Sequence, residues 1–357
     1  MWTSRAEIAL LRDLVAFPSV SGTEEKLGAW IVDWARGQGM QAAMDDASVW
    51  VTVPGKAAGS TLAFVSHIDT VPAGEGWTRP PFEATFEGNT LYGRGSGDAK
   101  ASVAAMLMAA KDVHDAGGPA KGRLLVILGF GEETKHTTMG KAVERLQPID
   151  AAVVGEPTNL EPAIAQRGLL MIDLVAKGLQ RHAGYAADNP DFTNAIVELS
   201  RNVARLPELL RERTHPILGI ATATPTILEA GVSRNVTPPT ARAVLDVRST
   251  PAWTHTELAD ALRAALDCEV VVTSDRLVPC ETPAGSRLLA LARQVRPAGT
   301  PFGSPTCSDW VFLRDRDAIK CGPGTSRRSH TPDEFVDLPE VTEARGFYAT
   351  LAQAYLA

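Results

Sequence analysis

The chain has 357 residues, of which 45% are hydrophobic and 22% charged, a composition typical of folded globular proteins. Its 42 acidic and 35 basic residues give a net charge of -7 without a long run of either sign, which disfavours a nucleic-acid or anionic-membrane surface. We therefore expect a small-molecule partner. A chain of this length exceeds one comfortable hydrophobic core, so two domains are expected.

The first residues predict a helix over residues 6–16, with Ser4 and Glu7 spaced as a capping box, and no signal-peptide core. The longest apolar stretch, residues 124–130, has the length of a strand and is far shorter than a membrane span. The four cysteines form no Cys-x-x-Cys pair, and a chain this large does not need disulfides. We therefore expect a cytoplasmic protein.

The first part of the chain alternates helical patterns with short β-rich runs. Helices are predicted at residues 6–16, 24–38 and 100–116, and strands at residues 49–53, 62–67, 123–129 and 151–154. This alternation is typical of an α/β domain with a mixed, mostly parallel sheet.

The order of the predicted strands and helices changes from Leu169 onwards. Strands are predicted at residues 169–176, 219–227, 241–248 and 269–273, and helices at residues 192–203 and 256–266. This βαββαβ order is that of a ferredoxin-like unit. Because the chain then returns to a helix at 286–296, a strand at 318–321 and a final helix after Pro339, we expect an inserted domain at residues 169–278. The surrounding domain, residues 1–168 and 279–357, is then discontinuous.

Several polar residues follow the predicted strands of the first domain at the point where each strand ends. His67 ends one strand, Glu132 and Glu133 follow a second, Glu156 follows a third, and Asp98 precedes a long helix. Ligands of open α/β sheets bind at the carboxyl ends of strands. Together with His330, these side chains are enough to hold two metal ions and to leave one carboxylate as a base, so the pattern indicates a hydrolase site.

Each of these residues taken alone has a simpler explanation, because a His-x-Asp sequence is usually a surface turn and a Glu-Glu pair a solvated helix start. Their order and shared position at strand ends favour the metal site. The remaining histidines, His114, His136, His215 and His255, are expected to be solvated or to cap helices. Cys307 is expected to be a buried, inert cysteine, since no histidine accompanies it.

Specific strings in the chain resemble a known family. They are Ser-His-Ile-Asp-Thr-Val-Pro at residues 66–72, Leu-Tyr-Gly-Arg-Gly-Ser-Gly-Asp-Ala-Lys at 91–100, Gly-Glu-Glu-Thr at 131–134, Val-Gly-Glu-Pro-Thr at 154–158, Gly-Pro-Gly at 322–324 and Ser-His-Thr-Pro-Asp-Glu at 329–334. The set resembles the acetylornithine deacetylase and succinyl-diaminopimelate desuccinylase family, dinuclear zinc amide hydrolases related to carboxypeptidase G. The resemblance extends over nearly the whole chain and is closest to the acetylornithine or acetylcitrulline deacetylase branch.

The resemblance implies a role for each residue of the site. Asp98 would bridge two Zn²⁺ ions, His67 and Glu156 would complete the first ion's ligands, and Glu133 and His330 those of the second. Glu132 would be the catalytic base that takes a proton from a metal-bridged water, and Asp69 would orient His67. Co²⁺ or Mn²⁺ are also compatible with mixed histidine and carboxylate ligands.

The resemblance also implies that the inserted domain acts as a lid and as the dimerisation domain. His182 would stabilise the oxyanion from across a homodimer, although by its sequence context alone it would be an ordinary surface histidine. Arg248, Arg234 and Asn235 are candidates for binding the substrate, together with Gly324 of the first domain. The acidic stretch Asp188-Asn189-Pro190-Asp191 and Ala101, where the family commonly has glycine, depart from the family pattern.

Three functions remain open from the sequence. The first is a metal-dependent hydrolase that cleaves the amide bond of an N-acyl amino acid, such as acetylornithine or acetylcitrulline in arginine biosynthesis. The second is a related dipeptidase, or a hydrolase that releases lysine from an amino-group carrier protein. The third is a catalytically silent ligand-binding relative, which would be expected to lack a ligand or the base, whereas here every position is filled.

Overall fold

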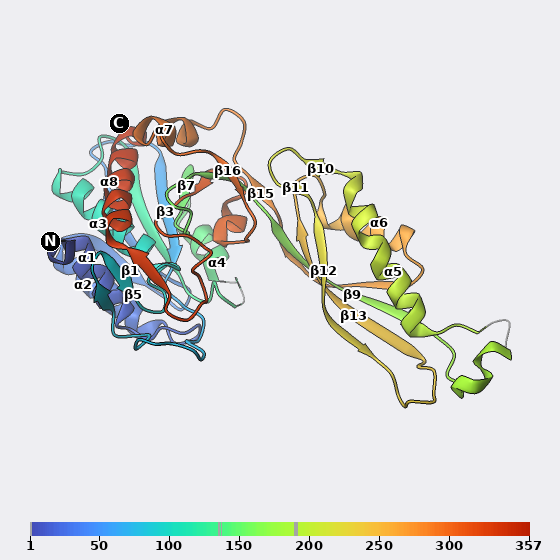
Figure 1. Cartoon of the computed structure of the whole chain (residues 1–357). Coiled ribbons are helices and arrows are strands. Elements are labelled where there is room, and N and C mark those ends of the chain that lie inside the picture. The colour runs from blue at the N-terminus through green and yellow to red at the C-terminus, as the bar shows by residue number, and fades with distance from the viewer. Residues whose placement is uncertain (1, 135, 137, 189–191) are drawn as a thin grey trace. The chain divides into compact units, whose positions relative to one another are not determined.

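The computed structural model describes residues 2–134, 136, 138–188 and 192–357. The chain forms two compact units (Figure 1). The first comprises residues 1–164, 282–302 and 308–357, and the second comprises residues 165–281 and 303–307.

The first unit is built on a mixed β-sheet in which the strand order is β1-β2-β6-β3-β7-β17-β8-β15, with β16 paired to β8. The four central strands, β6, β3, β7 and β17, are parallel, and the outer pairs are antiparallel. The predicted α/β fold with a mostly parallel sheet is therefore confirmed. The strands are β1 (Gln41–Met44), β2 (Ser48–Pro54), β3 (Thr61–His67), β6 (Arg123–Gly129), β7 (Ala151–Val154), β8 (Ala163–Gln166), β15 (Cys280–Glu281), β16 (Phe302–Ser304) and β17 (Asp317–Lys320).

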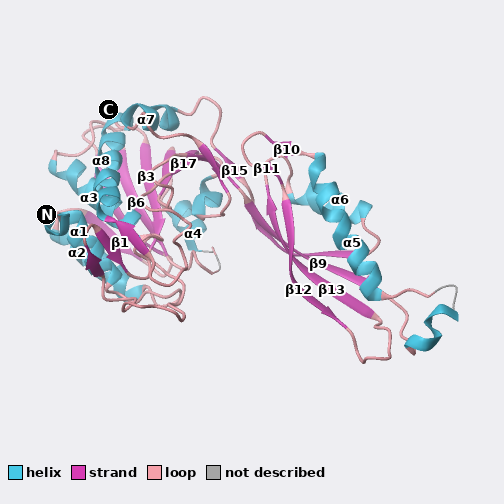
Figure 2. Cartoon of the chain, viewed as in Figure 1, coloured by secondary structure: helices cyan, strands magenta, loops and turns pink. Residues whose placement is uncertain are grey.

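The central strands have nearly continuous apolar sequences because helices cover both faces of the sheet. Every residue of β3 and of β7 is buried. One face of the sheet is covered by a layer of five helices: α1 (Ala6–Val15), α2 (Glu25–Gly37), α3 (Lys100–Asp115), α7 (Arg287–Val295) and α8 (Leu338–Tyr355) (Figure 2). The other face is covered by α4 (Thr138–Arg145) and the 3₁₀ turn η4 (Asp309–Leu313). The core beneath α3 and α8 is the largest hydrophobic cluster of the unit.

A small antiparallel sheet beside the main one consists of β4 (Thr85–Glu87), β5 (Thr90–Tyr92) and β18 (Phe335–Asp337), with β5 in the middle. The pairing of Phe335 with Tyr92 joins two segments that are far apart in sequence. The backbone amide of Gly93 donates to the carbonyl oxygen of Glu334 at 2.9 Å. The loop that carries His330 is thereby fixed beside the loop that carries Asp98.

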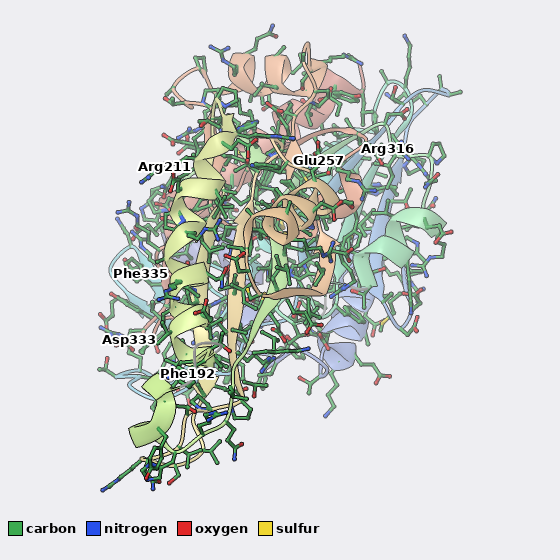
Figure 3. All side chains as sticks on the ribbon, turned by 90° about the vertical axis from the view of Figure 1, so that its right-hand side faces the viewer. Phe192, Arg211, Glu257, Arg316, Asp333 and Phe335 are labelled. Carbon is green, nitrogen blue, oxygen red and sulfur yellow. The ribbon has the colours of Figure 1, made fainter. Side chains whose placement is uncertain are left out.

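The second unit is a four-stranded antiparallel sheet with two helices on one face. The strand order is β12-β13-β9-β14, formed by β9 (Gly168–Lys177), β12 (Thr222–Ala230), β13 (Thr240–Ser249) and β14 (Glu269–Leu277). Helices α5 (Ala195–Leu209) and α6 (His255–Ala265) pack on the sheet through their apolar residues. The charged side chains near these helices, among them Arg211 and Glu257, lie on the outside (Figure 3). The short strands β10 (Thr214–His215) and β11 (Gly219–Ile220) form a separate pair.

The predicted capping box at the start of the chain is wrong. Arg5, not Ser4, precedes α1, and no side chain caps this helix end. Glu7 is buried and its carboxylate instead accepts hydrogen bonds from Thr342 and Arg345 of α8 at 2.7 Å. A tertiary ion pair has therefore replaced the local contact that the sequence spacing indicated.

Glu7→Gln is expected to reduce the free energy of unfolding at pH 7 by about 1.5–3 kcal/mol, the range for hydrogen bonds to a charged group. Burial raises the pKa of Glu7, but the bonds from Thr342 and Arg345 outweigh it and leave the pKa below its usual 4.5. The stabilisation is therefore complete above about pH 4.5 and is lost as the pH falls through the lowered pKa. Denaturant titrations should show a difference from wild type at pH 7 that shrinks at pH 3; a constant difference would contradict this.

Within the described residues, no helix is both long enough and apolar enough to cross a membrane. All four cysteines are free thiols in the structure. Cys307 is only partly buried, so the expectation of a buried cysteine is wrong for this residue.

Candidate metal centre and active site

The sheet brings the predicted ligands of the first unit to one edge. His67 is the last residue of β3, Glu132 and Glu133 follow β6 after two residues, and Glu156 follows β7 after one. Strands β6, β3 and β7 are adjacent and parallel, so their carboxyl ends coincide. Asp98 reaches the same edge from the loop before α3.

The buried His67 lies between carboxylates. Its Nε2 atom is 3.3 Å from Oδ1 of Asp98 and 3.8 Å from Oε1 of Glu156. Burial disfavours the imidazolium, but hydrogen bonds with Asp69 and Asp98 outweigh it and raise the pKa of His67 well above its usual value. The surroundings of Nε2 therefore attract positive charge, which a metal ion would supply.

His330 faces the other side of Asp98. Its Nε2 atom is 2.9 Å from Oε2 of Glu133 and 3.6 Å from Oδ2 of Asp98. The two oxygens of Asp98 thus face two different histidines, Oδ1 facing His67 and Oδ2 facing His330. This arrangement divides the donors into two sets that share one carboxylate.

The spacing of these donor atoms fits metal coordination. Tetrahedral donors about 2.0–2.2 Å from a zinc ion lie about 3.3–3.6 Å from one another. The separations of the two histidine nitrogens from Asp98 are 3.3 and 3.6 Å. His67, Asp98 and Glu133 have donor atoms that all lie within 4.8 Å of one another.

The burial and the hydrogen bonding of Glu156 also favour a bound metal ion. Among the described residues, the buried Oε1 atom of Glu156 has no hydrogen-bond partner. Burial, followed by the negative charge of Asp98, raises the pKa of Glu156 to about 8. A buried carboxylate without a donor is costly unless it is protonated or bound to a cation. The donor set therefore fits bound metal, with Asp98 placed between the two histidines.

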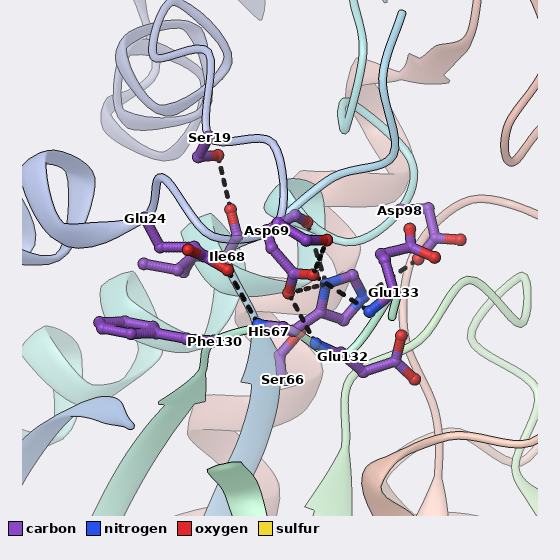
Figure 4. Close-up of polar contacts among 12 residues, drawn as sticks. Ser19, Glu24, Ser66, His67, Ile68, Asp69, Asp98, Phe130, Glu132 and Glu133 are labelled. Carbon is purple, nitrogen blue, oxygen red and sulfur yellow. Dashed lines mark hydrogen bonds and ion pairs between the residues drawn. The ribbon is translucent and has the colours of Figure 1, made fainter. Parts of the chain in front are cut away.

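Asp69 connects both parts of the centre (Figure 4). Its Oδ1 atom is 3.4 Å from Nδ1 of His67 and accepts a hydrogen bond from the backbone amide of Glu132 at 3.1 Å. Its Oδ2 atom accepts from the amide of Glu133 at 3.0 Å and from the hydroxyl of Ser21 at 2.7 Å. Nδ1 of His67 also lies 3.1 Å from the backbone carbonyl oxygen of Asp69, so Asp69 contacts both the ring of His67 and the backbone of the Glu132–Glu133 pair.

Glu132 lies beside these donors without belonging to the same group. Its side chain is buried, and among the described residues its carboxylate is paired with His136, whose Nδ1 atom is 3.5 Å from Oε1 of Glu132. Burial raises the pKa of Glu132 well above its usual value, and the charges of Glu156 and Asp309 add to this effect against the opposing influence of His67. A carboxylate with a raised pKa is a better proton acceptor, which suits a general base.

A buried ion pair that the sequence analysis missed positions Asp98. Oε1 of Glu334 accepts hydrogen bonds from the backbone amides of Gly97 and Asp98, both at 3.0 Å. Oε2 of Glu334 accepts from Nη1 of Arg94 at 2.6 Å, and both side chains are buried. Both residues lie within the motif strings, but no local pattern indicates that residues 94 and 334 meet.

Glu334→Gln is expected to leave the Arg94 guanidinium buried and unpaired, which typically costs about 3–5 kcal/mol of stability. Because glutamine has only one acceptor oxygen, it cannot bind both Arg94 and the amides of Gly97 and Asp98 as the carboxylate does, so Asp98 is held less firmly and the affinity for metal should also fall, by about 10- to 100-fold. Thermal unfolding and competition with a chelator measure the two effects. Glu87→Gln, which removes the exposed ion pair with Arg79, is the matched control and should change neither. Equal behaviour of the two variants would contradict the positioning role.

Gly324 lies next to the Asp98 loop. Its φ of 80° is one that glycine adopts easily, and a Cβ atom there would be 3.8 Å from Cα of Gly97. Its backbone amide donates to Glu340 at 2.9 Å.

The other predicted residues, His182, Arg234, Asn235 and Arg248, belong to the second unit. His182 is exposed, and its Nδ1 atom accepts a hydrogen bond from the amide of Gly184 at 3.1 Å. The neutral ring then carries its proton on Nε2, which can donate. Arg248 is bound in bidentate fashion by Asp246, whereas Arg234 and Asn235 are exposed.

Two of the histidines expected to be solvated or capping are buried instead. His255 binds the hydroxyl of Ser249 at 2.7 Å and the carbonyl oxygen of Asp275 at 2.8 Å. Nδ1 of His215 accepts from the amides of Ile217 and Leu218. His136 is mostly buried beside Glu132, so the expectation was wrong there too. His114 is only partly exposed.

The fold and the two-part cluster of histidines and carboxylates define a metal-dependent hydrolase. The family model of peptidase family M20/M25/M40 matches residues 63–354. The chain therefore belongs to this family of peptidases and is an amide-hydrolysing enzyme.

Individual relatives are similar over most of their length. Succinyl-diaminopimelate desuccinylase 2 of Ruegeria sp. is 30% identical, with 83% of this chain and 80% of the relative covered. Acetylornithine deacetylase of Klebsiella pneumoniae is 28% identical, with 92% of each covered.

Solved structures with 18% identity share the fold. The aminopeptidase PepT of Bacillus cereus has a TM-score of 0.82, with 98% of this chain and 97% of that chain covered. The YXEP protein of Bacillus subtilis, a dinuclear metal binding peptidase, has a TM-score of 0.77 with the same coverage.

Proposed function

We propose that the protein is a deacylase that hydrolyses the amide bond of an N-acyl amino acid. The observation that carries this proposal is the position of Asp98 between His67 and His330, with Glu132 beside the donors and outside their group. The curated relatives include a deacetylase and a desuccinylase, both named for N-acyl amino acids. The Gly-Pro-Gly turn at residues 322–324 favours an acetylated substrate such as acetylornithine or acetylcitrulline, and so a role in arginine biosynthesis.

Two Zn²⁺ ions per subunit are the proposed cofactors, with His67 and Glu156 on one ion, Glu133 and His330 on the other, and Asp98 on both. Histidine nitrogen with carboxylate oxygen suits zinc, and the same set accepts Co²⁺ or Mn²⁺. When bound, the ions would polarise the substrate carbonyl and lower the pKa of a water molecule.

Glu132 would take the proton from the attacking water and pass it to the amide nitrogen as the carbon–nitrogen bond breaks. The products are then a carboxylic acid and a free amine. Asp69 supports this step by holding the amides of Glu132 and Glu133 and the ring of His67. The raised pKa of Glu132 favours its accepting a proton.

A panel of N-acetyl, N-succinyl and dipeptide substrates, assayed with added zinc or cobalt, tests the substrate class. We expect hydrolysis of N-acetyl amino acids to have the highest kcat/KM. Hydrolysis of dipeptides alone would show a peptidase, and absence of turnover with every class would contradict the proposal.

The second unit is proposed to act as the lid and dimerisation domain, at residues 169–278, of a homodimer. His182 would donate from Nε2 to the oxyanion in the partner's site, while Asn235, Arg234 and Arg248 would bind the substrate. The hydrogen bond from Gly184 supports a donor role because it leaves the proton on Nε2. Arg248 would have to exchange Asp246 for a substrate carboxylate. The biosynthetic role and the free thiols suit a reducing cytoplasm.

His182→Ala is expected to bind metal and dimerise normally but to lose about 10²- to 10³-fold in kcat, the typical cost of one oxyanion donor. Mixing this variant with Glu132→Gln gives heterodimers in which one site has both residues if His182 acts across the dimer. Activity should then reappear after subunit exchange. Verified exchange without recovery would show that His182 acts within its own subunit or not at all.

A further inference from the structure

A second group of side chains with metal-donor atoms is separate from the ligands proposed for the main centre. It consists of Glu132, His136 and Asp309, whose donor atoms all lie within 4.8 Å of one another. Nδ1 of His136 is 3.5 Å from Oε1 of Glu132 and 3.4 Å from Oδ1 of Asp309. The contact with Asp309 is a hydrogen bond, and both distances are longer than the usual 2.7–3.2 Å of N–H···O hydrogen bonds. We call these three residues the Glu132 triad.

The separations in the Glu132 triad match those expected around a metal ion. Donors about 2.0–2.2 Å from a tetrahedral zinc ion are separated by about 3.3–3.6 Å. The two contacts of His136 fall in this interval, as do the contacts of Asp98 with the histidines of the main centre.

Burial and charge also favour a cation here. Asp309 is 2% exposed, and among the described residues its buried Oδ2 atom has no hydrogen-bond partner. The carboxylates of Glu132 and Asp309 both approach the same imidazole nitrogen of His136, at 3.5 and 3.4 Å, so their negative charges repel each other. One imidazole between two buried carboxylates leaves negative charge that a divalent ion would neutralise.

The local backbone delivers His136 to this position. Its amide donates to the carbonyl oxygen of Gly131 at 3.2 Å, and its φ of 44° is uncommon for a residue with a side chain. Asp309 starts the 3₁₀ turn η4, whose preceding residue Ser308 caps it through the amide of Trp310.

We propose that the Glu132 triad is an additional, inhibitory zinc site. An ion bound by Glu132, His136 and Asp309 occupies the carboxylate that would otherwise accept the proton, so excess zinc stops turnover without displacing the ions of the main centre. This inference rests on the proposed role of Glu132 as the base. A histidine donor selects zinc and similar transition metals over Mg²⁺ and Ca²⁺.

Equilibrium dialysis against rising zinc concentrations, with metal analysis of the protein, tests the site directly. Wild type should bind two ions tightly and a third more weakly, with inhibition following the third. His136→Ala should bind only two zinc ions. The zinc concentration that halves its activity, measured relative to its own activity with two ions, should rise roughly tenfold or more. Even the loss of an outer contact of a metal site typically lowers metal affinity 10- to 100-fold. His114→Ala, which removes a partly exposed histidine on α3, is the matched control and should keep the third ion.

A third ion retained by His136→Ala, or lost equally by His114→Ala, would overturn the proposal. A variant that does not fold leaves wild type as the test: crystals soaked in excess zinc should show an anomalous peak between Glu132, His136 and Asp309, and a saturated main centre with no peak there would contradict the site. The proposed function and the third zinc site can be refuted independently of each other. A third ion in a protein that hydrolyses no N-acyl amino acid would refute the deacylase, whereas deacylase activity with only two ions at any zinc concentration would refute the third site.

Discussion

Glu132→Gln is expected to lower kcat by about 10²- to 10⁴-fold, the usual contribution of a general base, while both metal ions stay bound. The amide of glutamine has nearly the same shape but cannot accept the proton from the attacking water. The backbone amide of residue 132 still donates to Asp69, so the neighbouring ligand Glu133 should keep its position. Steady-state kinetics and metal analysis on the same preparation measure both effects.

Glu144→Gln is the matched control, because Glu144 is an exposed glutamate on α4. Its kcat should equal that of wild type. Normal turnover in Glu132→Gln would exclude Glu132 as the base. Loss of one metal equivalent in that variant would instead assign Glu132 to the ligands.

Removal of the metal ions should abolish turnover and leave the fold largely intact. The proposed ligands lie at strand ends and in loops, whereas the strands themselves are held by a large apolar core. A protein whose core does not depend on the metal keeps its secondary structure after chelation, unlike a zinc finger. Circular dichroism should therefore change little while activity disappears, and adding zinc should restore activity.

Full turnover after exhaustive chelation, with the residual metal content measured, would disprove metal dependence. Global unfolding on chelation would show that the ions are structural. A lower melting temperature without unfolding is expected, since the buried carboxylates Glu132 and Glu156 lose the positive charge that offsets their burial.

Much of the fold and the centre could be predicted because the informative signals are local. Apolar runs that end at His67 and shortly before Glu132 and Glu156 mark the carboxyl ends of buried parallel strands, and adjacent parallel strands bring these ends together. The βαββαβ order of the second unit could also be predicted, because its strands and helices are consecutive segments of the sequence. Its observed strand order, β12-β13-β9-β14, is that of the expected ferredoxin-like unit.

Features that depend on tertiary contacts were missed. Glu7 has the spacing of a capping residue, but burial against Arg345 of α8 outweighs the local bond. Arg94 and Glu334 meet only because β5 and β18 pair. A single histidine in a turn gives no signal of its role, so the position of His136 beside Glu132 and Asp309 required the folded chain.

The most direct test of the central claim is an anomalous-difference map of crystals grown with two equivalents of zinc per chain. The account predicts two peaks on either side of Asp98, one contacted by His67 and Glu156 and the other by Glu133 and His330, with Glu132 bound to neither. A single peak, peaks at other residues, or Glu132 as a direct ligand of either ion would contradict it.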